Sequence, residues 1–364
     1  MAEPDRRPQR VAALLEAMET AQLDGLLVTS LPNIRYLTGF SGSSALVVVT
    51  QGETALITDF RYATQVKDEV SDSARVAIEP QSLWAGLWRL LPQMGTLEVL
   101  GFESAHLWHR DFERLLNAGS RWLWRPTVDL VETLRARKDA TEIARIAEAA
   151  DAAGRALAAT IERVRIGMTE LDVAGILEQS LREAGSEAYP FPTIVASGPR
   201  SALPHAHSTT RVTERGDLLL LDFGAVVGGY CSDVTRTVVL GTASDEQRSI
   251  YDVVRTANER AARGVRAGMR GRDADALARD YIEERGYADA FGHSLGHGIG
   301  LEVHEAPRLA RTADAVLPED AVVTIEPGIY REGWGGVRIE DDVVLSARGP
   351  RTLTAATRDF VEIS

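Results

Sequence analysis

The chain has 364 residues, of which 45% are hydrophobic and 26% charged, and its formal net charge is −13 at pH 7. These values are ordinary for a soluble protein with a well-formed core, and the length predicts about two domains. The acidic balance argues against nucleic acid or an anionic membrane as the main partner. The first ten residues are polar, no stretch approaches the ~20 apolar residues of a membrane span, and the single cysteine, Cys231, excludes an internal disulfide. We therefore expect a cytoplasmic protein.

The first third of the chain alternates predicted strands and helices. We expect helices over residues 11–24 and 106–117, and strands over 25–30, 45–50, 54–58 and 97–102. His106 and His109 are spaced i,i+3 on the second helix without accompanying carboxylates, so we interpret them as structural or surface residues. The pattern is typical of an α/β domain.

A domain boundary is expected near residues 130–138, where a basic segment precedes a capping box, Asp139 to Glu142, that opens a long predicted helix. We place the domains at residues 1–132 and 133–364. Only Lys67 and Lys138 among the 40 basic residues are lysine, and we draw no function from this skew.

The second domain repeats itself. The string Val-Arg-Ile-Gly-Met at residues 164–168 returns as Val-Arg-Ala-Gly-Met at 265–269, and residues 217–224 align with 321–328. Because the matches share one order and nearly one offset, they favour an internal duplication.

Each copy contains a hairpin with two carboxylates. In the first, an apolar strand ends on Asp222, a Val-Val-Gly-Gly turn follows, and a return strand over residues 230–240 carries Asp233 near its start. In the second, the strand ends on Glu326 and the return segment carries Glu340. Two hairpins related by a pseudo-twofold would bring four buried carboxylates to one point. Buried carboxylates repel one another, so a pair of divalent cations is a suitable partner.

Only the second half carries a histidine-rich run, residues 291–305, with His293, His297 and His304. Glycines at 296, 298 and 300 allow close approach of the backbone. Any one of these histidines alone is typical of a core residue, but three of them beside four carboxylates indicate a site. Oxygen-rich ligation with one imidazole suits Mn, Co or Fe better than a thiolate-type zinc site.

These residues resemble the pita-bread metallopeptidases, the family of methionine aminopeptidase, aminopeptidase P, prolidase and creatinase. The strings at 194–205, 293–305 and 324–330 resemble the Xaa-Pro-cleaving branch, and residues 33–40 resemble that branch's N-terminal domain. The resemblance implies an α+β protein, with a smaller creatinase-like α/β domain over 1–132 and a pseudo-twofold pita-bread catalytic domain over 133–364. Five positions match the family's metal ligands: Asp222, Asp233, His297, Glu326 and Glu340.

The resemblance implies two divalent metal ions per chain, most simply Mn, with Co, Zn or Fe as alternatives. Such ions lower the pKa of a shared water towards ~7, so that hydroxide attacks the peptide bond at neutral pH. Asp222 and Glu340 would bridge the ions and Asp233 would bind one of them. His297 and Glu326 would bind the other.

The resemblance also implies roles for residues around the ligands. Glu326 would be the general base, and His205 and His304 would contact the substrate carbonyl or the tetrahedral intermediate. Phe191 would line the proline pocket, and Arg338 would offset carboxylate charge or meet a substrate carboxylate. Three further residues lie near these positions. His207 lies two residues after His205; the resemblance favours His205, and a direct role for His207 stays open. His293 is expected to support its neighbours rather than bind metal, and Cys231 is not expected to act as a nucleophile, since a metal hydroxide makes a thiol nucleophile unnecessary.

The implied activity is hydrolysis of Xaa-Pro bonds, with an Xaa-Pro dipeptidase (prolidase) favoured over an aminopeptidase P that acts on longer peptides. A methionine aminopeptidase would lack the N-terminal domain, and creatinase chemistry does without the metals, whereas all five ligands are present here. A non-catalytic interaction module remains a remote alternative, which loss of ligands would have indicated. We also expect a homodimer in which the N-terminal domain of one subunit edges the other's site.

Overall fold

The computed structural model describes residues 5–364, and the chain divides at Arg135 into two compact units. The second unit comprises Ala136–Ser364. The division lies next to residue 132, where the sequence suggested a boundary. In the described chain, no helix combines the length and the apolar composition that crossing a membrane requires.

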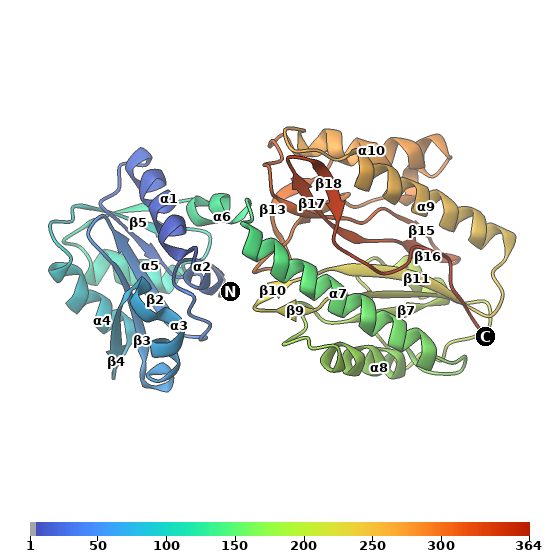
Figure 1. Ribbon diagram of the computed structural model, residues 1–364, viewed down its shortest axis with the longest axis horizontal. Coiled ribbons are helices and arrows are strands. Elements are labelled where there is room, and N and C mark those ends of the chain that lie inside the picture. The colour runs from blue at the N-terminus through green and yellow to red at the C-terminus, as the bar shows by residue number, and fades with distance from the viewer. Residues whose placement is uncertain (1–4) are drawn as a thin grey trace. The chain divides into compact units, whose positions relative to one another are not determined.

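The first unit is a six-stranded mixed sheet with helices around it (Figure 1). The strand order is β4-β3-β2-β1-β5-β6, antiparallel between β1, β2 and β3 and parallel elsewhere. The strands are β1 (Gly25–Val28), β2 (Ala45–Thr50), β3 (Thr54–Asp59), β4 (Arg75–Glu79), β5 (Val99–Glu103) and β6 (Leu123–Thr127). The helices are α1 (Arg7–Thr20), α2 (Leu31–Thr38), α3 (Gln65–Val70), α4 (Leu83–Leu90), α5 (His109–Ala118) and α6 (Leu130–Arg135).

Two features of this unit differ from the sequence expectation. The edge strands β4 and β6 were not predicted, because they are largely exposed and lack a continuous apolar run. The helix expected from residue 106 begins at His109, so His106 and His109 do not share a helix. His106 instead places its Nε2 atom 2.9 Å from Glu132 Oε1.

The second unit confirms the internal duplication at the level of the backbone. Its helices form two pairs, α7 (Ala140–Arg163) with α8 (Glu170–Glu183) and α9 (Asp245–Gly264) with α10 (Gly271–Glu284). The first helix of each pair is followed by a valine of nearly identical conformation, φ −63° and ψ 136° in one copy and φ −61° and ψ 139° in the other. The following glycines, Gly167 and Gly268, both adopt positive φ, at 92° and 86°, which favours glycine at this turn.

The strands of this unit lie between the two helix pairs (Figure 1). One sheet has the order β19-β11-β8-β7 and the other β13-β12-β14-β17-β18. The first comprises β7 (Ile194–Ser197), β8 (Leu218–Phe223), β11 (Val234–Leu240) and β19 (Glu362–Ile363). The second comprises β12 (Gly296–Gly298), β13 (Glu305–Leu309), β14 (Val322–Ile325), β17 (Asp341–Ser346) and β18 (Gly349–Thr352). Two short ribbons complete the unit: β9 (Val226–Val227) with β10 (Tyr230–Cys231), and β15 (Gly328–Arg331) with β16 (Gly335–Arg338).

The return strand expected over residues 230–240 is interrupted. It divides into β10 and β11, and Asp233 lies in the gap; Glu340 lies in the equivalent gap between β16 and β17. Each gap residue donates its backbone N–H to the other copy: Asp233 to Asp342 Oδ2 at 3.1 Å, and Glu340 to the Thr235 carbonyl at 3.1 Å. The interruptions therefore join the two copies where the predicted ligands lie.

Arg236 reinforces this junction from a buried position. Its guanidinium donates to the carbonyls of Thr235 and Glu340 at 2.9 and 2.6 Å, and to Asp341 Oδ1 at 2.7 Å. It also donates to the carbonyls of Ala356 and Thr357 at 2.8 and 2.7 Å. One arginine thus connects the first hairpin, the second hairpin and the C-terminal segment.

We expect Arg236→Met to lower the free energy of unfolding of the metal-free chain by about 3–5 kcal/mol, because it leaves buried acceptors and part of the Asp341 charge without a partner. Urea unfolding followed by circular dichroism measures this. Arg248→Met is the control: Arg248 also pairs with the C-terminal segment, at Glu362, but this pair is exposed and contributes little. Equal losses for the two variants would contradict the role given to Arg236.

Candidate active site

Four carboxylates and one imidazole converge where the two copies meet. Asp233, His297 and Glu340 each offer an atom within 4.8 Å of the others. Glu326 joins them, with its Oε1 atom 3.6 Å from His297 Nε2. Asp222 is connected to the group through Arg338, whose Nη2 atom lies 2.5 Å from Asp222 Oδ2.

The His297 ring is oriented as a metal ligand would be. Its Nδ1 atom lies 3.0 Å from the Gly298 carbonyl, which can only accept, so Nδ1 carries the proton. Nε2 then has a free lone pair. It faces Asp233 Oδ2 at 3.9 Å and Glu326 Oε1 at 3.6 Å, which are too far for hydrogen bonds. Burial lowers the pKa of His297 to about 4, so the ring is neutral at pH 7.

Without a cation the carboxylates resist ionisation. Burial, and next the repulsion from Glu340, raise the pKa of both Asp233 and Glu326 well above the ordinary values. Burial and the charge of Asp222 raise the pKa of Glu340 to about 8. Asp233 Oδ1 is buried and has no hydrogen-bond partner. A buried carboxylate with one unpartnered oxygen, together with a bare imidazole lone pair, fits a divalent cation.

Arg338 is the one cation placed among these carboxylates in the described chain. It is 3% exposed, and besides Asp222 it donates to Thr235 Oγ1 at 3.0 Å and to the Tyr330 hydroxyl at 2.8 Å. Thr235 in turn donates to Glu340 Oε2 at 2.6 Å. Neither Thr235 nor Tyr330 was predicted from the sequence as a site residue. Tyr330 closes the motif at 324–330 and Thr235 lies two residues after Asp233, so both stood next to residues that had been identified.

His293 supports this network and is not available as a ligand. Tyr330 accepts from Arg338, so its hydroxyl proton points to His293 Nε2 at 2.9 Å. His293 Nδ1 donates to the Ser294 carbonyl at 2.8 Å. Both ring nitrogens are therefore used.

His304 and His205 lie at the exposed side of the cluster. The His304 ring packs against His297 with centroids 4.4 Å apart. Burial, and next the charge of His205, lower the pKa of His304. The charge of His205 also acts on the pKa of Asp222, which burial nevertheless raises overall. Both rings are thus near the carboxylates and reachable from solvent.

The remaining candidates lie in different surroundings. Phe191 is half-buried, ahead of β7. His207 is exposed, and its carbonyl accepts from Arg200 Nη2 at 2.6 Å, so nothing ties its ring to the cluster. Cys231 is buried in an apolar cluster, with its Sγ atom 4.0 Å from the Leu301 carbonyl.

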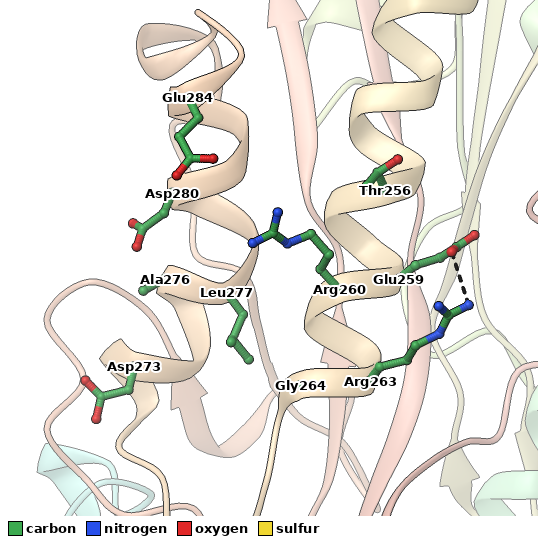
Figure 2. A pocket seen from close by; sticks show the side chains of 10 residues that line it. All are labelled: Thr256, Glu259, Arg260, Arg263, Gly264, Asp273, Ala276, Leu277, Asp280 and Glu284. Carbon is green, nitrogen blue, oxygen red and sulfur yellow. Dashed lines mark hydrogen bonds and ion pairs between the residues drawn. The ribbon is translucent and has the colours of Figure 1, made fainter.

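A groove in the described chain lies apart from these residues. It has a volume of about 610 Å³ and runs between α9 and α10, lined by charged side chains such as Arg260, Asp280 and Glu284 (Figure 2). None of the site residues predicted from the sequence lines it. The candidate site is therefore identified by the chemistry of the carboxylate cluster and not by this groove.

Comparisons with known proteins identify the family of this chain. The model of metallopeptidase family M24 matches residues 144–347, and that of the creatinase/prolidase N-terminal domain matches residues 10–137. The chain is 42% identical to an uncharacterized peptidase of Bacillus subtilis over 93% of this chain and 96% of the other.

Two solved structures are similar over nearly their whole length. An Xaa-Pro dipeptidase from Bacillus anthracis has a TM-score of 0.93 and 39% identity, covering 98% of this chain and 99% of that one. An X-Pro aminopeptidase from Thermotoga maritima has a TM-score of 0.90 and 37% identity, covering 97% and 99%. They confirm the two-domain α+β fold expected from the sequence. The chain belongs to metallopeptidase family M24, with a creatinase/prolidase-type N-terminal domain.

Proposed function

We propose that this protein hydrolyses Xaa-Pro peptide bonds with two divalent metal ions, and that dipeptides are its preferred substrates. One observation carries the proposal: Asp233, whose Oδ1 atom has no hydrogen-bond partner and whose Oδ2 atom lies 3.9 Å from His297 Nε2, shares a cluster of buried carboxylates with that bare imidazole lone pair. The similar proteins named Xaa-Pro dipeptidase and X-Pro aminopeptidase support the bond class but divide over peptide length.

We assign the metal ligands as Asp222, Asp233, His297, Glu326 and Glu340. From the sequence, Asp222 and Glu340 were expected to bridge the ions. Asp233 and Glu340 both lie beside His297, whereas Asp222 is held by Arg338, so Asp233, Glu340 and His297 would hold an ion together. Ions bound here would supply a water of lowered pKa and polarise the substrate carbonyl.

The chain's own groups supply proton transfer and orientation. Glu326 is partly exposed beside His297 and is placed to take a proton from the attacking water and return it to the proline nitrogen. His304 and His205, at the open side, donate to the oxygen that develops negative charge. The scissile nitrogen of an Xaa-Pro bond has no hydrogen, so the half-buried ring of Phe191 is proposed as the wall for the proline ring.

Recognition of a dipeptide requires a cation for the carboxylate that follows proline. Arg338 was one expectation for this role, but it is buried and its guanidinium is occupied by Asp222, Tyr330 and Thr235. We propose Arg308 instead. It pairs with His297 across the β12–β13 ladder, so both side chains lie on one face of the sheet, and its charge contributes to the lowered pKa of His297. Arg308 is exposed.

Manganese as the metal, a homodimer in which the N-terminal domain edges the partner's site, and a cytoplasmic location follow from the family resemblance and the composition. We keep them as proposals. Elemental analysis and light scattering of the active protein address the first two.

We expect Asp233→Asn to reduce bound Mn below two ions per chain and to abolish hydrolysis of Met-Pro, because it removes a ligand charge without changing size. Asp342→Asn is the matched control. Asp342 is also buried and lies close by, but its carboxylate accepts a hydrogen bond from the Asp233 backbone N–H. The side-chain oxygen of an asparagine can accept the same hydrogen bond. Elemental analysis measures the metal, and full occupancy in both variants would refute the ligand assignment.

The metal-free protein should lose stability as pH rises. Folded Glu340 holds its proton to about pH 8, whereas an unfolded glutamate releases it near 4.5. The contribution of Glu340 to the free energy of unfolding is therefore complete below pH 4.5 and is lost as pH rises through 8. Urea unfolding in chelator at pH 5, 6.5 and 8 should show this fall, and Glu340→Gln should reduce it. If the free energy of unfolding falls with pH equally in Glu340→Gln and in the unmodified protein, Glu340 is not the cause of the fall.

Arg308→Ala should lower kcat/KM for Met-Pro by roughly 10- to 100-fold, the usual effect of losing a charge-assisted hydrogen bond, and leave Met-Pro-Ala-Ala nearly unchanged. Arg311→Ala, which removes a nearby exposed arginine paired with Glu283, should affect neither peptide. A tenfold preference of the unmodified protein for the tetrapeptide would favour aminopeptidase P and leave the metal chemistry untouched.

A further inference from the structure

Lys138 is a buried cation in a chain that otherwise uses arginine almost throughout. Its side chain is 1% exposed and its Nζ atom lies 3.1 Å from Glu305 Oε2, with Glu305 6% exposed. Lys67, the other lysine, is exposed. Lys138 and Glu305 are 167 residues apart.

A single acceptor explains why lysine occupies this position. In the part of the chain that the structure describes, Glu305 Oε2 is the hydrogen-bond partner of Nζ. An arginine would bring five N–H donors into the same buried space and leave several unsatisfied.

Glu305 closes the loop that carries His304. Its second oxygen, Oε1, accepts from the Glu302 N–H at 3.0 Å, and the Gly300 N–H donates to the Glu302 carbonyl at 3.0 Å. The loop backbone passes so close to this carboxylate that a Cβ at Gly300 would lie 2.8 Å from Oε2 and 2.9 Å from Oε1. The carboxylate is thus the centre around which residues 300–305 are folded.

His304 depends on this loop for its placement. Within residues 5–364 its ring forms no hydrogen bond, and its one ring contact is with His297. The backbone therefore sets where the ring lies, and the Glu305 carboxylate sets the backbone.

We propose that the Lys138–Glu305 ion pair is a positioning element that sets His304 for the reaction, acting through the loop of residues 300–305. The inference rests on the proposed function, in which His304 donates to the substrate oxygen. Lys138 lies just before α7, and its backbone N–H donates to the Asp320 carbonyl at 3.0 Å. The ion pair therefore anchors the loop of residues 300–305 to the segment that leads into α7.

The test compares hydrolysis of Met-Pro by four variants in the Mn-loaded, full-length protein. Lys138→Met should lower kcat by about ten- to a hundredfold, because a misplacement near 1 Å costs on the order of 10²-fold. Bound metal should remain at two ions per chain and KM should change little. Arg137→Met is the control: Arg137 precedes Lys138 and its contact with Glu319, at 3.9 Å, is exposed.

Two double variants separate positioning from general stability. Lys138→Met combined with Glu305→Gln removes both charges of the pair, so the loss of Tm caused by breaking the pair should recover while kcat stays low; recovery of both would mean a structural role alone. Lys138→Met combined with His304→Ala should be no slower than His304→Ala, because both act on one step. Additive losses, or an unchanged kcat for Lys138→Met, would overturn the proposal. Failure of the unmodified protein to cleave Met-Pro would instead overturn the proposed function.

Discussion

The repulsion among buried carboxylates is the constraint on which the second unit depends. Asp222, Asp233, Glu326 and Glu340 converge where water is largely excluded, and Arg338 alone among the described cations lies between them. Such an arrangement is unfavourable unless the surrounding structure enforces it. The strand interruptions, the Thr235 hydroxyl and the Arg236 hydrogen bonds enforce it, and the resulting excess of negative charge is what a pair of divalent ions requires.

The duplication explains why this enforcement is possible. Each copy supplies one strand that ends on a carboxylate and one interruption that holds another, and each interruption is hydrogen-bonded to the opposite copy. Neither copy contains a complete ligand set. The two copies are nevertheless not equivalent, because the histidine-bearing loop with His297 and His304 occurs in the second copy alone.

Local sequence signals predicted much of this arrangement. Apolar runs identified β8 and β14, the capping box at Asp139 identified α7, and the glycine turns identified the repeat. The interruption at Asp233 was not predictable, since residues 230–240 have the composition of one continuous strand. At the interruption, the Asp233 backbone N–H donates to Asp342, 109 residues away. The burial of Arg338 and the pairing of Lys138 with Glu305 likewise depend on contacts between distant segments, which a single sequence does not reveal.

The position of the C-terminal segment has a consequence for biosynthesis. Residues 356–363 supply carbonyl acceptors to Arg236, a ring that stacks on Tyr251 with centroids 4.1 Å apart, and the edge strand β19 beside β11. A ribosome delivers these residues after every proposed ligand has been made. The carboxylates therefore meet their full support only after residues 356–363 have been synthesised. For a peptidase, this order separates the appearance of hydrolytic activity from the period in which the chain itself is still unfolded.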